Sequence, residues 1–593
     1  MTPPAGALVP LRPPGLLGLF REVLDSSLVS RGAGEALALL GHADAFWGSL
    51  PLDELRRMAE GGNAAAQAEL AWRYAVGEGV PKSPAQALAW ARPSAEKQCG
   101  AGEAVLGWLL YHGHGVARDL AEAARLFELA AARGDARAMD MLARCRFFGR
   151  GVRQNRASAV RLWRGAADKG VAAAMFCLGM CLQAGEGTDP DPTEAVTWFR
   201  AAARKRVAGA MYLLGQCYAQ GSGVTRDPEA SLGWLRRAAE LGSRDAQYEV
   251  GCAHHDGRGH LEHDIDEALR WWRAAARQGH ARAQLKLGHC YRWGEGVSEN
   301  RAVAIGWYRR AAEGGEVSAQ VALGECHEAG EGVAVDAQAA YAWYERAAQA
   351  GDAHARAEQG RCLLHGIGVP ADTRRGERLL RAATEAGWQP ALGELERYWF
   401  GLGERHLHGR GVAASAEKAL ACYRRAAELG HKRAAFMLGE CCRRGFGMAP
   451  APREAELWLL KAAALFDAKV ALADLYFFGQ PGFAPNLREA FRWYEQATQQ
   501  QDDAYAMYSL GWCLLHGHGV RRDAATALRW LRRAAQSGDA AARYELGCAY
   551  YRGSGTTRNS RLAMKWLRAA AQLGHAEAQA FLERIERGGE SLN

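Results

Sequence analysis

The sequence predicts an all-α protein, built as a solenoid of about fourteen helix-pair repeats. A glycine recurs with a spacing of 36 residues in most cases, as between Gly187 and Gly223, and a fixed period of roughly 20 to 50 residues is typical of repeat arrays. Within each period, apolar residues follow helical spacing on two successive segments. Because each unit of such an array contacts only its neighbours, we predict that the 593 residues form mainly one solenoid instead of several globular domains.

The segment 207–243 is a clear copy of the repeat, and its first half predicts one helix, called helix A. Ala210, Leu214, Cys217 and Tyr218 stand at positions i, i+4, i+7 and i+8. Residues at these positions share one face of an α-helix. Helix A therefore presents one apolar stripe for packing.

The second half of the same copy predicts helix B. Gly221 ends helix A, because glycine takes left-handed backbone conformations without steric cost. Asp227 and Pro228 are suited to the N-cap and the first helical position of helix B. Trp234 follows on its apolar face, and Gly242 ends it.

Two slots repeat along the chain with few exceptions. The second turn glycine recurs at Gly79, Gly115, Gly151, Gly187, Gly223, Gly259, Gly296, Gly332, Gly368, Gly411, Gly447, Gly482, Gly519 and Gly555. An N-cap residue follows at Ser83, Asp119, Asn155, Asp191, Asp227, Asp264, Asn300, Asp336, Asp372, Ser415, Asn486, Asp523 and Asn559, and Ala451 is the exception. Such a cap stabilises each copy by roughly 1 kcal/mol, so we interpret the acidic residues among them as structural.

A tryptophan recurs eleven residues after the second turn glycine, as at Trp198 and Trp234. A tryptophan stripe could stack on bases or sugars, but at helical spacing opposite alanines it predicts core packing. Glycine or alanine six residues before the turn, as at Gly179 and Gly215, lets two helices approach closely.

The order A-x3-LG-x-C-Y-x2-G-x-GV-x3-D-x3-A-x2-W-x3-AA closely resembles the Sel-one-like repeat (SLR), a branch of the tetratricopeptide-like α-solenoids. The resemblance implies antiparallel helix pairs in a right-handed superhelix, with helices A on the concave side. It also implies a scaffold or adaptor in bacterial signalling, envelope or host-interaction pathways, or in eukaryotic protein quality control. The resemblance implies no catalytic residue and no cofactor.

The chain divides into four parts by sequence. We predict a disordered Pro-rich N-terminus at 1–14, a helical capping region at 15–63, fourteen repeats at 64–575, and a capping helix with a tail at 576–593. We identify neither a signal peptide nor a transmembrane segment, which predicts a cytoplasmic protein.

The fourteen cysteines are predicted to be free, buried thiols in a reducing compartment. Eight of them share one helix A slot, without a partner on helix B. Equivalent positions in successive repeats lie roughly 9–10 Å apart, beyond the reach of a disulfide.

The net charge of +8 is modest for this length, because arginines alternate with acidic residues. This pattern favours a solvated outer face over a nucleic-acid-binding face, which remains an alternative. The other alternative is hydrolase-like or metal-dependent activity at an unrecognised site. Its weak candidates are the clustered histidines His254, His255, His260 and His263, which we interpret as polar loop residues.

The favoured function is a non-enzymatic scaffold that binds another protein or peptide segment through the concave surface of helices A. The slots nine and five residues before the first turn glycine point away from the packing stripe and vary between copies. The predicted partner-binding residues are Trp108, Tyr212, Gln216, Tyr248, His289, Phe400, Glu404, Phe436, Glu440, Asp474, Tyr508 and Trp512. Aromatic anchors beside carboxylates predict a basic and apolar partner segment.

One region departs from the pattern and is predicted to interrupt the array, between Ala353 and Gly411. Gln359 replaces the helix A leucine, Leu379 replaces the tryptophan, and nine residues are inserted at 389–397. We expect the lowest stability there, because each change weakens packing between neighbouring repeats.

Overall fold

A computed structural model describes residues 45–258 and 261–586. Within these residues the protein contains helices α3 to α33 and no β-strand, apart from an isolated bridge between Gln480 and Phe483. The all-α prediction is confirmed. The segment 1–14, most of the capping region at 15–63, and His260 lie outside the described residues.

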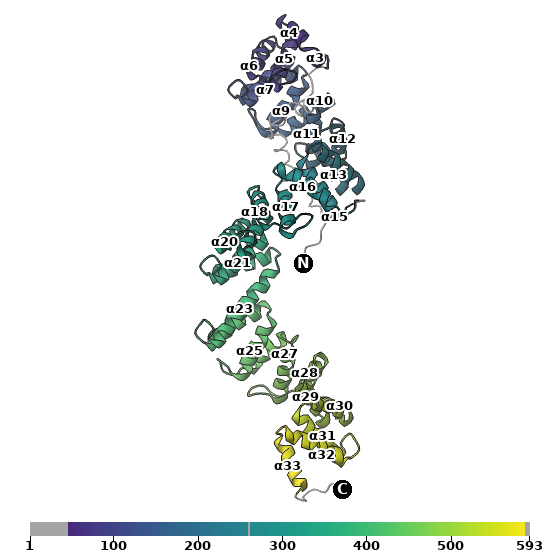
Figure 1. The fold of residues 1–593 in the computed structure, drawn as a ribbon, viewed down its shortest axis with the longest axis vertical. Helices are drawn as coiled ribbons and strands as arrows, with labels where there is room; N and C mark the ends of the chain where they lie inside the picture. The colour runs from purple at the N-terminus through teal and green to yellow at the C-terminus, as the bar shows by residue number, and fades with distance from the viewer. Residues whose placement is uncertain (1–44, 259–260, 587–593) are drawn as a thin grey trace. The chain divides into compact units, whose positions relative to one another are not determined.

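The chain forms two compact units, one ending at Val335 and the other beginning at Asp336 (Figure 1). The first holds α3 (Ala45–Ser49), α4 (Leu52–Glu60), α5 (Ala64–Val76), α6 (Pro84–Glu96), α7 (Gly100–His112), α8 (Leu120–Ala132), α9 (Ala136–Phe148), α10 (Arg156–Asp168), α11 (Ala172–Ala184), α12 (Pro192–Arg204), α13 (Ala208–Gln220), α14 (Pro228–Glu240), α15 (Arg244–Asp256), α16 (Ile265–Arg277), α17 (Ala281–Trp293), α18 (Arg301–Glu313) and α19 (Val317–Ala329). From α5 onward, odd-numbered helices are helices A and even-numbered ones are helices B.

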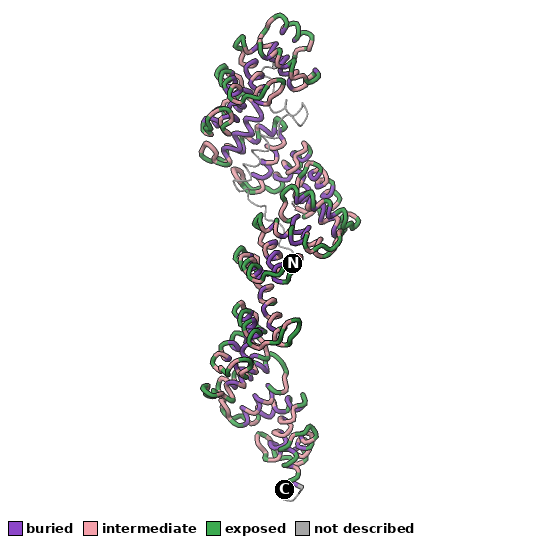
Figure 2. The backbone as a smooth tube through the Cα atoms, turned by 90° about the vertical axis from the view of Figure 1, so that its left-hand side faces the viewer, coloured by how far each residue is buried: buried purple, intermediate pink, exposed green. Residues whose placement is uncertain are grey.

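The second unit continues the same alternation. It holds α20 (Ala337–Gln349), α21 (Ala353–His365), α22 (Thr373–Glu385), α23 (Pro390–His408), α24 (Ala416–Leu429), α25 (Lys432–Arg444), α26 (Pro452–Lys461), α27 (Phe466–Phe478), α28 (Leu487–Gln500), α29 (Ala504–His516), α30 (Ala524–Gln536), α31 (Ala540–Arg552), α32 (Ser560–Gln572) and α33 (Ala576–Glu586). Figure 2 shows buried residues recurring along the helices of each unit, whereas the turns are mostly exposed.

The turn between helices A and B requires glycine for two separate reasons. Gly221 has a φ of +75°, and its N–H donates to the Cys217 carbonyl as an αL cap. Gly223 has a φ of +69°, and a Cβ added there would lie 2.1 Å from the carbonyl oxygen of Pro192, at the start of α12. In most copies the second glycine therefore also lets the turn approach the preceding helix B, whereas Gly79, Gly411 and Gly482 have open space at this position.

The predicted N-caps of the helices B are confirmed. In the copy at 207–243, the Asp227 carboxylate accepts backbone hydrogen bonds from Glu229 and Ala230 at 3.0 and 2.9 Å. The other twelve cap residues also accept from the first turn of their helices, whereas Ala451 provides no side-chain cap for α26.

The prediction that the recurring tryptophan fills the core is wrong in most copies, because the next residue does so. Trp198 is half-buried, whereas Phe199 is fully buried. The Phe199 ring lies against Gly179, where an added Cβ would be 2.6 Å from Cε1. One residue turns a helix by about 100°, so a shift of one position moves the tryptophan to the edge of the interface. There its ring packs with arginine, as Trp234 does with Arg237 at 4.9 Å.

The insertion at 389–397 extends a helix instead of forming a separate linker, since α23 runs continuously from Pro390 to His408. Gln359 is buried with hydrogen-bond partners: its amide donates to the Tyr341 hydroxyl and to Glu345, each at 3.2 Å. The division between the two units lies at Val335, upstream of the segment that the sequence singled out. The expected low stability of that segment stays a prediction.

Candidate interaction surfaces

The twelve predicted partner-binding residues are less exposed than the sequence suggested. Trp108 and Gln216 are each only 5% exposed, so the expectation that they present a free surface is wrong. Trp108 packs edge-on against Trp72 of the neighbouring helix A at 5.6 Å between ring centroids. The other ten residues are half-buried. Helices A of successive repeats lie close enough for these side chains to pack on one another.

Two aromatic residues of the set pack on histidines of the next repeat. Tyr248 stacks on His280 at 4.7 Å, and Phe400 stacks on His431 at 4.5 Å. Each of these histidines caps the next helix A by accepting a backbone N–H at 3.1 Å, from Ala283 in the first case. Burial lowers the pKa of His431, which favours the neutral imidazole that can accept this bond. The rings therefore help to fix the next repeat.

The predicted carboxylates do not form a free negative row. Glu404 accepts a hydrogen bond from the Tyr423 hydroxyl. Glu440 accepts two hydrogen bonds from Arg443 at 2.7 and 2.9 Å, and it forms an ion pair with Arg444 at 2.8 Å. These carboxylates are already engaged within the chain.

Asp474 is also engaged within the chain. Its Oδ1 accepts hydrogen bonds from the hydroxyls of Tyr494 and Tyr505, at 2.7 and 2.9 Å. Burial raises the pKa of Asp474, although these two hydrogen bonds act in the opposite direction. A substitution of Asp474 therefore affects the packing of α27 against its neighbours as well as the surface potential.

The remaining residues of the set lie beside histidines or acidic groups. The Nδ1 atom of His289 is 3.1 Å from the Tyr308 hydroxyl, and burial lowers the pKa of His289 to about 4. Trp512 stacks on His518 at 4.7 Å. Burial raises the pKa of Tyr212 and of Tyr508.

Phe436 is held from its own helix, because the Arg433 guanidinium lies 5.2 Å from its ring centroid. Phe436 therefore has a cation–π contact within the chain.

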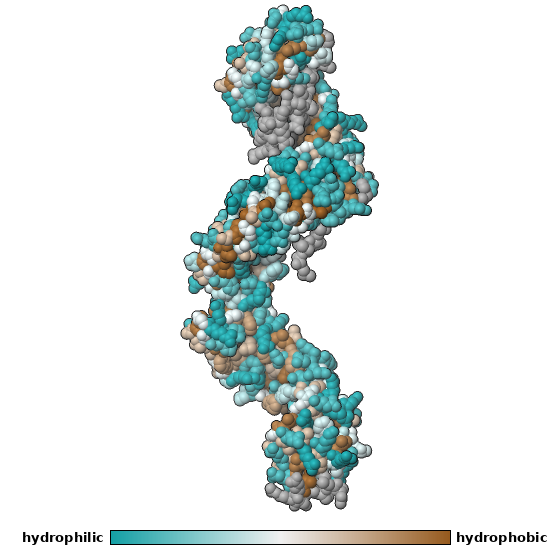
Figure 3. Space-filling view, viewed as in Figure 1, coloured by the Kyte–Doolittle hydropathy of each residue, from teal (hydrophilic) through white to brown (hydrophobic). Residues whose placement is uncertain are grey.

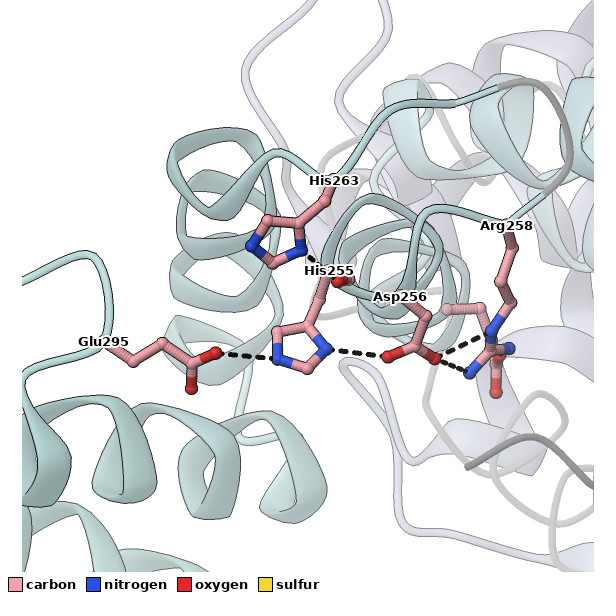
Figure 4. A network of polar contacts seen from close by, with 6 residues as sticks. His255, Asp256, Arg258, His263 and Glu295 are labelled. Carbon is pink, nitrogen blue, oxygen red and sulfur yellow. Dashed lines mark hydrogen bonds and ion pairs between the residues drawn. The ribbon is translucent and has the colours of Figure 1, made fainter. Parts of the chain in front are cut away.

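The histidine cluster forms a polar network instead of an open ligand set (Figure 4). Both ring nitrogens of His255 are engaged, Nδ1 with Asp256 at 2.7 Å and Nε2 with Glu295 of the next repeat at 3.0 Å. Burial acts to raise the pKa of Asp256, but hydrogen bonds from His255 and Arg258 lower it overall. His263 Nδ1 lies 2.5 Å from the backbone carbonyl of His255.

This network does not have the arrangement of a metal site. Neither ring nitrogen of His255 is left to bind a metal, and His254 is buried beside it. In the part of the chain that the structure describes, no group of three or more His, Cys, Asp or Glu side chains is arranged to hold a metal ion. The network instead joins two successive repeats through Glu295.

An aromatic cluster in the second unit joins the predicted Trp512 to Phe477 and Phe478, two residues that the sequence analysis missed. Phe478 ends α27 and is 68% exposed. Its ring packs edge-on against Phe477 at 4.9 Å, and Phe477 packs against Trp512 at 5.5 Å. We call Phe477, Phe478 and Trp512 the aromatic cluster. An aromatic residue directly before the first turn glycine, Gly479, is the signal that could have found it.

The sequence profile of the Sel1 repeat family matches fourteen segments, at 64–99, 101–135, 136–171, 172–206, 208–243, 244–280, 281–316, 317–352, 353–388, 400–431, 432–465, 467–502, 504–539 and 540–575. The chain belongs to the Sel1 repeat family. The Sel1 repeat solenoid is typical of non-enzymatic scaffolds for protein–protein interaction. Among the described residues, no helix is both long and apolar enough to span a bilayer.

The chain is similar to individual proteins over different lengths. A stretch of 130 residues is 33% identical to chitin synthase regulatory factor 3 of Schizosaccharomyces pombe, covering 21% of this chain but only 14% of that protein. A solved protective antigen of uropathogenic Escherichia coli is 25% identical, with 90% of this chain and 97% of that chain covered and a TM-score of 0.48. A solved Sel1 repeat protein of Oxalobacter formigenes is 28% identical, with coverages of 55% and 92% and a TM-score of 0.41.

Proposed function

We propose that this chain is an adaptor that binds a partner protein through the helix A surface of its second unit, in a signalling or regulatory pathway. The aromatic cluster carries this proposal. Phe478 is 68% exposed but backed by Phe477 and Trp512, so it is held in place at the surface. Exposed aromatic side chains on a rigid support are typical anchors of protein interfaces.

The surface of the protein is mixed in polarity. On the face shown in Figure 3, apolar residues occur as separate patches between hydrophilic ones. Such a surface fits a partner that is bound through a few anchors. Tyr508, one turn before Trp512 on α29, extends the proposed surface along the helix.

The partner segment is proposed to be mainly apolar. The carboxylates that would attract a basic segment, Glu404, Glu440 and Asp474, are occupied by hydroxyl or guanidinium groups of the same chain. Their half-exposed edges, with those of Phe400 and Phe436, are proposed to border the binding surface. Tyr212, Tyr248 and His289 belong to the first unit and are proposed to bind a partner there. A regulatory role agrees with the partial similarity to a chitin synthase regulatory factor.

The test compares capture of partners by variants of the full-length chain. The immobilised chain is incubated with extract of the native host, and bound proteins are quantified by mass spectrometry. We expect the amount of specific partner captured by the Phe478→Ser, Trp512→Ala double variant to fall about tenfold or more. The control is Leu457→Ser on α26, which changes a side chain that is 62% exposed. Equal loss in the control, or unchanged capture by the double variant, would contradict the proposal.

A further inference from the structure

A pocket in the first unit opens between the helix pair α13–α14 and the next helix A, α15. Its volume is about 180 Å³, and its apolar wall is formed by Leu232 and Leu235 of α14 and by Ala253 of α15. Gln216, one of the predicted partner-binding residues, also lines it, although this side chain is only 5% exposed. The pocket is smaller than typical sites for whole ligands, so its size suits a single side chain.

The pocket is present because two positions of this repeat carry small side chains. At the position of Leu235, the repeats before and after it carry Phe199 and Trp272, which are both fully buried. At the position of Ala253, the preceding helix A carries Cys217. Helix pairs are otherwise closely packed, so the volume that these larger side chains fill elsewhere stays open here.

The Glu249 carboxylate on α15 lines this pocket and accepts no hydrogen bond from the described residues. The side chain is 19% exposed, and both carboxylate oxygens remain accessible. Burial raises the pKa of Glu249, because partial desolvation disfavours the charged form. The pocket therefore contains two acceptor oxygens without donors.

The arginines near Glu249 are held by other carboxylates. Arg258 lies 4.0 Å from the Glu249 carboxylate, beyond hydrogen-bonding distance. Its Nε atom donates instead to Asp256 at 2.8 Å. Arg282 forms an ion pair with Glu316 at 3.6 Å. In the part of the chain that the structure describes, Glu249 therefore has no cation within hydrogen-bonding distance.

We propose that this pocket, called the Glu249 pocket, binds the lysine side chain of a partner protein. The ammonium group donates to Glu249, and the four methylene groups pack against Leu232 and Leu235. A compact ammonium fits beside Arg258 better than a second planar guanidinium does. Arg226 also lines the pocket, but it is exposed, so solvent screens its charge. The inference goes beyond the proposed function, because this pocket lies in the first unit and includes no residue of the aromatic cluster.

Binding is tested on the full-length chain with Nα-acetyl-lysine methylamide, detected by saturation-transfer difference NMR. We expect saturation of the lysine methylene protons. Glu249→Gln should weaken binding about tenfold or more, because it keeps the shape of the side chain but removes the charge. The control is Glu122→Gln on α8, where the carboxylate is 39% exposed, and it should bind like the wild type. Equal binding by the wild type and Glu249→Gln would overturn the proposal.

A second variant tests the pocket without a change in charge. Leu235→Phe inserts the residue that the preceding repeat carries at this position, and Gly215 lies against Leu235 as Gly179 lies against Phe199. The melting temperature of this variant should therefore stay within about 2 °C of the wild type. Its lysine binding should fall about tenfold or more, because the ring fills the pocket. Undiminished binding by the folded variant would contradict the proposed location.

Three other blocked amino acids identify what the pocket recognises. The arginine derivative should bind more weakly than the lysine derivative, and the uncharged norleucine derivative about tenfold more weakly. The glutamate derivative should not bind, although Arg226 and Arg258 could attract it. Binding of any of the three as strong as that of lysine would overturn the proposal. The variant Phe478→Ser should bind the lysine derivative normally, which separates this pocket from the aromatic cluster.

Discussion

Gly288 of α17 lies directly against Tyr308 of α18, so that a Cβ added to Gly288 would be 2.4 Å from the Cε1 atom of the ring. Tyr308 is fully buried, and its hydroxyl reaches His289 on the facing helix. The glycine allows the two helices of one repeat to close around the ring. The same pairing of glycine and a large residue occurs at Gly179 and Phe199.

The first prediction concerns this close approach. Gly288→Ala should destabilise the chain by about 1–3 kcal/mol, because the added methyl group overlaps a ring that has no free space. Gly306→Ala on α18 is the matched control, since nothing lies within 4 Å of its added Cβ. This second change should be neutral or stabilise by about 0.5–1 kcal/mol. Urea unfolding followed by circular dichroism measures both, and equal effects would contradict the packing argument.

The second prediction concerns the thiols. All fourteen cysteines are free in the structure, and Cys99 alone among them is not buried. Burial raises the pKa of Cys217 and of Cys442 to about 11, so little thiolate forms near neutral pH. A thiol reagent at pH 7.5 should therefore modify Cys99 first, and the remainder only after denaturation. Rapid modification of several thiols in the native chain would show that helices A are more open than the structure indicates.

The third prediction concerns acid sensitivity of the first unit. Burial lowers the pKa of His112 and of His289 to about 4, from an ordinary value of 6.5. Between these values the unfolded chain binds more protons than the folded chain, so stability falls as the pH falls. Each histidine should contribute a loss of about 1 kcal/mol between pH 7 and pH 5.5.

The variant His289→Gln should remove about one such contribution, because glutamine retains a hydrogen-bonding group near Tyr308 but does not titrate in this range. His408→Gln is the control, since His408 is 48% exposed. The measurement is the free energy of unfolding in urea at both pH values. If the free energy of unfolding of His289→Gln falls between the two pH values as much as that of the wild type, His289 does not cause the acid sensitivity.

The fourth prediction concerns Asp474. Asp474→Ala leaves the hydroxyls of Tyr494 and Tyr505 without their acceptor and should destabilise the second unit by about 1–3 kcal/mol. Asp467→Ala on the same helix removes a carboxylate that is 50% exposed and pairs with Arg433, so it should cost less than about 0.5 kcal/mol. Hydrogen exchange measures the difference: α27 to α29 should lose more protection in Asp474→Ala than in Asp467→Ala. Similar protection in both variants would mean that the tyrosine contacts contribute little to stability.

Local features were predictable because they are set within a few residues. Gly221 ends a helix through its own backbone conformation, and Asp227 caps the next helix through N–H groups two and three residues away. The chain repeats these signals with a period of about 36 residues, so the helix pairs and their number could be read from the amino acids alone.

Side-chain partners could not be predicted in the same way. Trp198 and Phe199 are adjacent and both apolar, and only the packing against Gly179 decides which of them is buried. The occupied carboxylates of Glu404, Glu440 and Asp474 likewise depend on which groups a neighbouring segment brings within hydrogen-bonding distance.

The sequence by itself determined the all-α fold, the boundaries of most helices and the repeat family, because backbone conformation and helical periodicity are local properties. The tertiary structure alone decided that Trp108 and Gln216 are buried, that Asp474 serves two tyrosines, and that Phe478 remains exposed. These outcomes depend on the rotation and spacing of helices from successive repeats, where about 100° per residue or a few ångströms changes which side chains meet.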